Sequence, residues 1–142
     1  MLKKYIIFFL SILACPLYSQ CIDQGTITSQ SQIDSLSGCE IFQGNLILNG
    51  ANITDLSSLS SLSVVSGSFA LLNTSVADLS PLSSLNSAQQ VFVQGNTSLN
   101  SCCEFLQFID AAHLGSIMNV SLSNKGECDD LEAIMLDCLG YI

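Results

Sequence analysis

The apolar residues in the middle of the chain recur with a period of 23 residues. Residues 45–67 align with residues 68–90, and the same phase continues from residue 91. Each repeat opens with an alternating segment such as Leu46-Ile47-Leu48, which predicts a short strand with one side on the core. Apolar residues then follow at three-residue spacing, which favours a 3-10 or irregular turn over an α-helix. In the first repeat these residues are Ile53, Leu56, Leu59 and Leu62.

A strand followed by regularly spaced leucines, at a period of this length, is typical of leucine-rich repeats. We therefore predict an α/β-type solenoid, a short right-handed leucine-rich-repeat coil with a parallel β-sheet face. One coil cannot bury its own apolar side, so both ends of the stack need caps. The predicted domain covers residues 21–142, with an N-terminal cap at 21–44, repeats at 45–101 and a disulfide-bonded helical C-terminal cap at 102–142.

Smaller signals predict the elements of the C-terminal cap and the ends of the strands. The cap is expected to contain one helix at residues 102–109, a last strand at residues 119–123 and a second helix at residues 129–138. Glycine and asparagine tolerate left-handed backbone geometry, so they mark the residues at which strands end. These residues are Gly50, Asn73 and Asn96.

The side chains that alternate away from the core form the outer face of the predicted sheet. In the 23-residue phase the outward positions are Asn45, Ile47, Asn49, Ser68, Ala70, Leu72, Val91, Val93 and Gly95. The apolar members stack across neighbouring strands, and an apolar stripe on a soluble domain indicates a contact surface. The alternative is ordinary β-propensity on a partly exposed sheet. We predict a binding face formed by Ile47, Asn49, Ala70, Leu72, Val91 and Val93.

The N-terminus has the layout of a secretory signal peptide. Lys3 and Lys4 precede an almost unbroken apolar segment at residues 5–14, which is too short to span a bilayer comfortably. We predict a signal peptide at residues 1–20, cleavage after Gln20, and a secreted protein. No later segment is long and apolar enough to predict a transmembrane span.

Two alternatives to free secretion stay open at this stage. The leader could remain uncleaved as an N-terminal anchor. Residues 12–15 also form a loose lipobox, in which Cys15 would be lipidated and would anchor the protein to the cell envelope.

The cysteines beyond the leader are even in number, which predicts a disulfide framework in an exported chain. A bridge between Cys21 and Cys39 would pin the N-terminal cap. The other four cysteines are Cys102, Cys103, Cys128 and Cys138. We expect them to pair with one another, and the sequence leaves open which pairs form. A zinc site is the alternative, but no Cys-x-x-Cys pair is present, so we expect no metal.

The charge balance excludes one class of partner. The full chain has a formal net charge of −9 and only three basic residues. Without the predicted signal peptide, Lys125 alone stands against twelve carboxylates. A domain this acidic repels phosphate backbones, so nucleic-acid binding is excluded and the acidity favours solubility.

No combination of residues predicts catalysis or a cofactor. The single histidine, His113, is expected near the end of a capping helix, where its charge interacts with the helix dipole. Asp55 and Asp78 occupy equivalent repeat positions and are expected to bond the backbone of a turn. Two carboxylates about 5 Å apart on stacked coils could alternatively form a glycosidase pair. An acidic cluster at residues 127–132 lacks EF-hand spacing, and calcium stays an alternative there.

Residues 37–48, Ser-Gly-Cys-Glu-Ile-Phe-Gln-Gly-Asn-Leu-Ile-Leu, resemble the receptor L domain of insulin-receptor-like and EGF-receptor-like ectodomains. The chain is also similar to secreted bacterial leucine-rich-repeat proteins. The resemblance implies a ligand-binding module that is not an enzyme. We therefore expect a secreted or surface module that recognises an extracellular protein or glycan through its sheet face. The alternative is a structural, self-associating component of the cell envelope.

Overall fold

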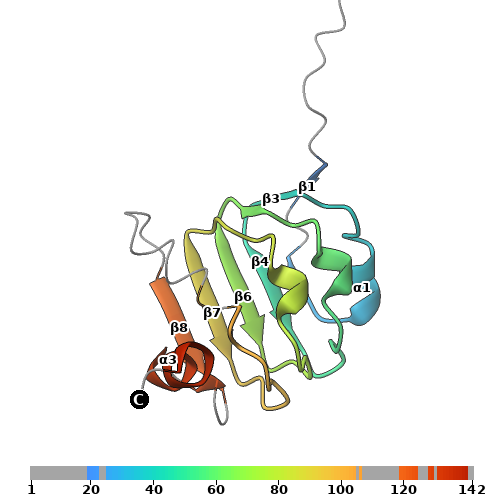
Figure 1. Cartoon of the computed structure of the whole chain (residues 1–142). Coiled ribbons are helices and arrows are strands. Elements are labelled where there is room, and N and C mark those ends of the chain that lie inside the picture. The colour runs from blue at the N-terminus through green and yellow to red at the C-terminus, as the bar shows by residue number, and fades with distance from the viewer. Residues whose placement is uncertain are drawn as a thin grey trace, which may run out of the picture.

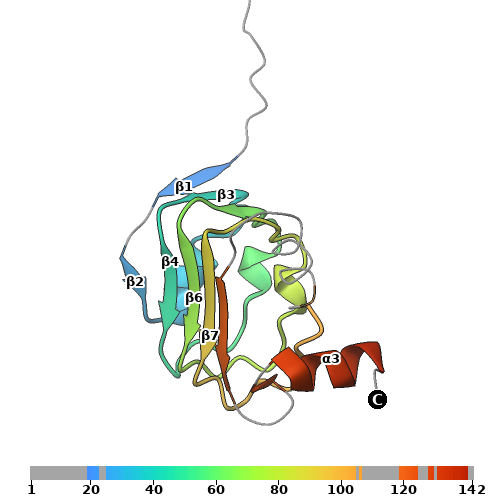
Figure 2. The same cartoon turned by 90° about the vertical axis from the view of Figure 1, so that its left-hand side faces the viewer.

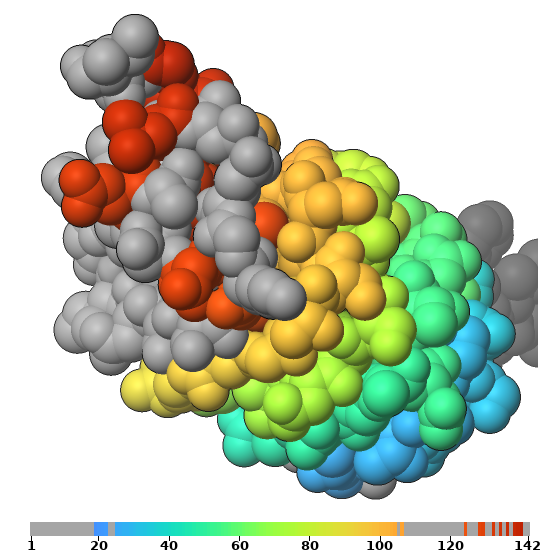
Figure 3. All heavy atoms as spheres, turned by 90° about the horizontal axis from the view of Figure 1, so that it is seen from below, coloured from blue at the N-terminus to red at the C-terminus, as the bar shows by residue number. Residues whose placement is uncertain are grey.

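The computed structural model describes residues 19–22, 25–104, 106, 119–124, 128–129 and 131–140. These residues form an α/β architecture of two parallel sheets with short helical segments, linked by three disulfide bonds (Figure 1). Both sheets are open over this part of the chain. Consecutive segments lie side by side in chain order across the molecule, from the blue N-terminal residues to the orange third repeat (Figure 3).

The larger sheet contains the strands that the repeat predicts. Its order is β2-β4-β6-β7-β8, and every neighbouring pair is parallel. Since the order in space is the order in the chain, each strand pairs with the equivalent strand of the repeat before it. The strands are β2 (Thr26–Ile27), β4 (Leu46–Asn49), β6 (Ser68–Leu72), β7 (Gln90–Gln94) and β8 (Asn119–Ser123).

Short helical segments cover one side of the larger sheet, as Figure 2 shows. They are the helix α1 (Gln30–Asp34) and the 3-10 helices η1 (Ser57–Leu59) and η2 (Ser80–Leu82). The two 3-10 helices confirm the turn type that the three-residue leucine spacing predicts. No element among the described residues covers the other side of the sheet in this view.

A second, smaller sheet lies at one end of the larger one (Figure 1). It consists of β1 (Gln20–Ile22), β3 (Ile41–Gln43) and β5 (Val64–Val65), all parallel. The sequence analysis did not predict this sheet, because strands of two or three residues are too short to show an alternating pattern. The first coils of the chain therefore supply a strand to each of two sheets.

The core lies between the larger sheet and the helical segments. Two sets of apolar positions that follow the strands and coincide in the 23-residue phase are buried together in successive repeats, with at most 4% of each residue exposed. Removing such apolar surface from water contributes roughly 25 cal/mol per Å². The two sets are Ile53, Val76, Leu99 and Leu56, Leu79, Cys102. The aligned Phe105 and Phe108 lie outside the described residues, as do four of the eight residues of the helix expected at 102–109; of the other four, residues 102–104 are not helical.

The third strand departs from the 23-residue phase by one position. Val64 pairs with Ser87 and Asp78 with Ser101 at 23 residues, whereas β7 pairs with β6 at 22. A shift of one residue turns every side chain of a strand to the opposite face. Val91 and Val93 are consequently 0% exposed, so the prediction that they face outward was wrong.

The same shift decides which residue ends each strand. Gly50, Asn73 and Gly95 follow β4, β6 and β7 and have φ values of 152°, 51° and 70°. This confirms the prediction for Gly50 and Asn73. For Asn96 the prediction was wrong, because the shorter offset brings Gly95 to the turn instead.

Asn96 is fully buried and joins neighbouring coils through its side-chain amide. Its Oδ1 accepts hydrogen bonds from the backbone N–H of Thr74 at 2.9 Å and from the Thr74 hydroxyl at 2.7 Å. Its Nδ2 donates to the Leu71 carbonyl at 2.9 Å and to Asn124 Oδ1 at 3.0 Å. Asn124 in turn donates to the Cys128 carbonyl at 2.9 Å. This polar column fixes the offset of the third strand against both of its neighbours.

The disulfide framework is confirmed. Cys21 bonds Cys39, as the sequence predicts, with the Cα atoms 5.9 Å apart. The sequence leaves the pairing of the other four cysteines open, and in the structure Cys102 bonds Cys128 and Cys103 bonds Cys138.

The C-terminal strand and the last helix are found close to their predicted positions. β8 is the predicted strand at 119–123, and α3 (Leu131–Leu139) is the helix expected at 129–138. Cys138 lies on α3, so the bridge to Cys103 links this helix to the end of the repeats. None of the described helices is long and apolar enough to cross a membrane.

Candidate functional site

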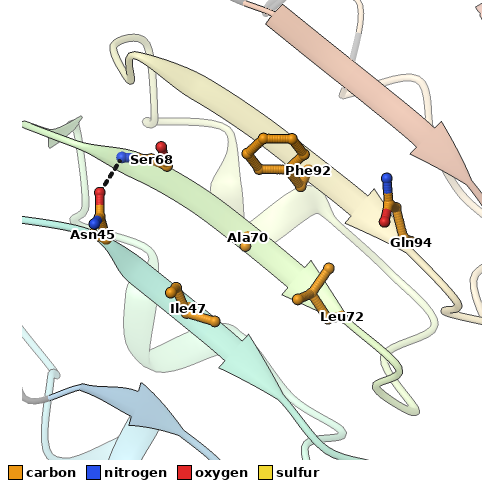
Figure 4. A pocket seen from close by; sticks show the side chains of 7 residues that line it. All are labelled: Asn45, Ile47, Ser68, Ala70, Leu72, Phe92 and Gln94. Carbon is orange, nitrogen blue, oxygen red and sulfur yellow. Dashed lines mark hydrogen bonds between the residues drawn. The ribbon is translucent and has the colours of Figure 1, made fainter.

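A shallow hollow of about 370 Å³ lies on the uncovered face of the larger sheet (Figure 4). Ile47, Ala70 and Phe92 are direct neighbours across β4, β6 and β7 in the strand register. The small side chain of Ala70 leaves space between the two larger ones, so Ala70 forms the floor and Ile47 and Phe92 form opposite walls. The hollow is lined by Asn45, Ile47, Ser68, Ala70, Leu72, Phe92 and Gln94.

Hydrogen bonds hold the polar residues around this hollow in defined positions. Asn45 Oδ1 accepts from the backbone N–H of Ser68 at 2.9 Å, as the dashed line in Figure 4 shows. The Ser68 hydroxyl donates to Gln90 Oε1 at 3.4 Å. Gly67 allows this arrangement, because a Cβ at that position would lie 2.8 Å from the Gly44 carbonyl oxygen and would meet Asn45 Oδ1 as well. The edge of the hollow is therefore preorganised before any ligand arrives.

The hollow carries no charged side chain. Its lining consists of four apolar and three neutral polar residues. Asp34 and Asp55 instead lie on or beside α1 and η1, on the helical side of the sheet. Taking an unpaired charge out of water is costly, so a neutral apolar surface favours an uncharged ligand group.

The structure brings together part of the predicted binding face and corrects the rest. Ile47, Ala70 and Leu72, which the sequence places on the outer sheet face, line the hollow. Asn49 lies at the end of β4 beside it, where its Oδ1 accepts from Asn73 Nδ2 at 3.3 Å. Val91 and Val93 lie in the core and cannot contact a ligand on this face.

Phe92 and Gln94 are the lining residues that the sequence analysis missed. The segment Gln90-Val91-Phe92-Val93-Gln94 is apolar at three successive positions, so alternation alone does not fix its orientation. The flanking glutamines contain the missing signal, since burying Val91 and Val93 keeps both amides at the surface. The larger cost of burying two amides favours the observed orientation.

Asp55 and Asp78 bond turn backbone, as predicted for both. Asp55 Oδ1 accepts from the Ser57 hydroxyl at 2.5 Å and from the Ser57 N–H at 2.8 Å. The Ser80 hydroxyl donates to Asp78 Oδ2 at 2.6 Å, and the Ser80 N–H donates to Asp78 Oδ1 at 2.8 Å. These bonds, the hydroxyl first and the N–H second, lower the pKa of each carboxyl. A glycosidase pair needs one acid with a raised pKa, so the lowered pKa of both carboxyls favours the structural role.

The other groups considered for catalysis or metal binding are only partly visible. His113, Glu127 and Asp130 lie outside the described residues. Within the described part of the chain, no three or more His, Cys, Asp or Glu residues gather as metal ligands.

Comparison with protein families identifies one match. The family model described as Receptor L domain matches residues 38–101. The match confirms the resemblance to this domain and contains every residue that lines the hollow. Comparisons with curated proteins and with solved structures gave no significant match.

The matched family has a known broad class of function, and a non-catalytic binding role for this chain is consistent with it. Receptor L domains are extracellular modules that bind ligands, including other extracellular proteins, and they are not enzymes. The disulfide bonds and the family match together indicate an extracellular domain.

Proposed function

We propose that this chain is a secreted or surface-held, non-catalytic module that recognises a protein or a glycan through the hollow between β4, β6 and β7. The observation that carries the proposal is the apolar floor and walls of Ile47, Ala70 and Phe92 on an uncovered sheet face. A contiguous apolar patch with polar residues at its edge is typical of a contact surface.

The size of the hollow limits what it can hold. Sites for whole small molecules have volumes of roughly 300–1,000 Å³ and enclose most of the ligand. At about 370 Å³ and open to one side, this hollow suits a single side chain or sugar ring of a larger partner. The remaining contact then falls on neighbouring outward residues such as Gln90 and Asn49, which are partly exposed.

The proposed scaffold is a right-handed leucine-rich solenoid that spans residues 21–142 and is capped at both ends. The support for it is the parallel pairing of equivalent strands and the placing of the disulfide bonds outside the two regular repeats. A stack of this kind holds the hollow rigidly, because β4, β6 and β7 are each bonded to a neighbouring strand on both sides.

A screen of this chain against defined extracellular proteins and a glycan array identifies binders. The affinity of each binder for two single-residue variants of this chain then tests the proposal. Ala70 lines the hollow but is only 5% exposed, so Ala70→Phe fills the hollow from its floor, and thermal unfolding of the variant checks that it stays folded. Ala51→Phe adds the same bulk at an exposed turn residue that does not line the hollow. We expect Ala70→Phe to weaken binding by about tenfold or more, equivalent to about 1.4 kcal/mol, and Ala51→Phe to leave it unchanged. Equal affinities for both variants would contradict the proposal, as would a screen without any binder.

A second candidate function is self-association within a cell envelope. The observation that favours it is a set of exposed large apolar residues away from the hollow: Ile22 at 73%, Leu136 at 50% and Leu139 at 49%. This function predicts a mass in light scattering that rises with protein concentration. A monomer at every concentration measured would contradict it.

A further inference from the structure

We propose that the leader is removed by hydrolysis of a peptide bond N-terminal to Ser19, so that Ser19 and Gln20 remain in the folded domain. The inference goes beyond the binding role and does not depend on it. It does rest on the signal peptide expected at the N-terminus, and it moves the end of that segment from Gln20 to a position before Ser19.

Ser19 makes the first backbone contacts of the smaller sheet. Its carbonyl oxygen accepts hydrogen bonds from the N–H groups of Glu40 at 3.0 Å and Ile41 at 3.2 Å. Gln20 then pairs with Ile41, and Cys21 with Phe42, in the parallel register of β1 and β3. Residues 19 and 20 thus supply the acceptor and the first paired residue of an edge strand.

The same contact recurs in the repeats that follow. The carbonyl of Glu40 accepts from the N–H groups of Ser63 at 2.8 Å and Val64 at 3.2 Å. The carbonyl of Ser63 accepts from the N–H of Asn86 at 3.0 Å. Ser19, Glu40 and Ser63 therefore hold equivalent positions in successive coils, so the first coil includes Ser19 as well as Cys21.

Cleavage after Gln20 would remove part of this coil. Cys21 would keep its bond to Cys39, but the N–H groups of Glu40 and Ile41 would lose their acceptor. An edge with unpaired backbone groups is a template for pairing with another chain. Retaining Ser19 keeps this edge covered by the protein's own backbone.

The chemistry needs only water and a signal peptidase. Water adds across the scissile peptide bond, leaving a carboxylate on the leader and a new α-amine on the domain. Such peptidases require a small residue before the bond. Ala14 is a small residue directly before the Ala14–Cys15 bond, and cleavage there leaves Ser19 in the domain; Ile12, two residues before Ala14, departs from the A-x-A-like pattern.

The first test is the N-terminal residue of the full chain after export by its own leader. Intact mass after reduction and N-terminal sequencing identify this residue directly. We expect it to fall between residues 15 and 19, and a lipid mass on Cys15 agrees with this outcome. A chain that begins at Gln20 or Cys21, or that still begins at Met1, overturns the proposal.

The second test asks whether Ser19 makes its contact in the exported protein. Amide hydrogen exchange should show Glu40 and Ile41 protected, with Ser63 and Val64 as reference amides of the next coil. A matched mature chain begins at Cys21, so it lacks the Ser19 carbonyl and has no upstream residue whose backbone could replace it. We expect it to exchange Glu40 and Ile41 about tenfold faster or more while Ser63 and Val64 stay unchanged. Equal protection in both proteins overturns the role assigned to Ser19.

Discussion

The side-chain amide of Gln30 bonds both backbone polar groups of Asp55, in the next coil. Its Oε1 accepts from the Asp55 N–H at 3.1 Å, and its Nε2 donates to the Asp55 carbonyl at 2.8 Å. Oε1 also accepts from the Thr54 N–H at 3.1 Å. One amide thus takes the place of a neighbouring strand and attaches α1 to the first regular repeat.

Replacing this amide should destabilise the protein measurably. Gln30→Ala removes four hydrogen bonds, one of them to Asp34, each worth about 0.5–1.5 kcal/mol net when fully formed, and at this partly exposed position water replaces part of that. We expect the free energy of unfolding in urea to fall by about 1–2 kcal/mol. Gln89→Ala is the matched control, because Gln89 is exposed and should change stability by less than about 0.5 kcal/mol. A Gln30→Ala variant as stable as the control would show that the clamp contributes nothing.

The buried amide of Asn96 should contribute more than Gln30. Asn96→Ala leaves a cavity and strips the Thr74 N–H and the Leu71 carbonyl of their partner inside the protein. An unsatisfied buried group costs about 1–3 kcal/mol, so we expect a loss of about 3 kcal/mol or more. Asn86→Ala, at an exposed position, serves as the comparison in the same urea experiment. A loss no larger than that of the exposed variant contradicts the polar column.

The register of β7 can be tested with two neighbouring substitutions. Val93→Lys places a charge in the core and should prevent folding or cost more than about 4 kcal/mol. Phe92→Lys points outward and should leave the protein folded, with a change of about 1 kcal/mol or less. Circular dichroism and thermal unfolding of the two variants distinguish them. If Phe92→Lys were the less stable of the two variants, Phe92 would be the buried residue. That result would contradict the observed register of β7 and support the 23-residue phase.

The lowered pKa values of Asp55 and Asp78 predict a pH dependence of stability. A carboxyl whose pKa is depressed in the folded protein adds stability above its unfolded pKa, and this stability is lost as the pH falls through the folded value. With an ordinary value of 3.8 for Asp78, the loss should begin near that pH and continue below it. Asp78→Asn removes this contribution, so the stability difference from wild type should be constant above about pH 5 and shrink in more acidic solution. A difference that grows on acidification would contradict the assigned hydrogen bonds.

The period of the apolar residues predicted much of this architecture. Leu46, Leu48, Phe69 and Leu71 recur in the 23-residue phase, with polar Asn45 and Ser68 directly before the strands' first buried residues, so their burial follows from the sequence pattern. The three-residue leucine spacing predicted the 3-10 turns for the same reason. The number and positions of the cysteines predicted a disulfide framework. Which cysteines pair depends on distances in the folded protein, and the spacing of cysteines along the sequence does not determine these distances.

The missed features share a physical cause. Three successive apolar residues, Val91 to Val93, fit either face of a sheet, and the choice depends on Gln90, Gln94 and the buried Asn96 in neighbouring coils. The strands of the smaller sheet are too short for a pattern and are held by pairing with the adjacent coil. Ile47, Ala70 and Leu72 were predicted on the binding face, but Phe92 could not be, because its orientation depends on that register.

The central claim is that a partner contacts the hollow on the sheet face, and methyl NMR of the complex tests it most directly. Methyl groups of Ile47, Ala70 and Leu72 report on the hollow, whereas those of Val91 and Val93 report on the core directly behind it. On titration with a binder identified in the screen, we expect the first set to shift and saturate with the measured affinity, with little change in the valines. Saturating binding that leaves Ile47, Ala70 and Leu72 unshifted would contradict the claim.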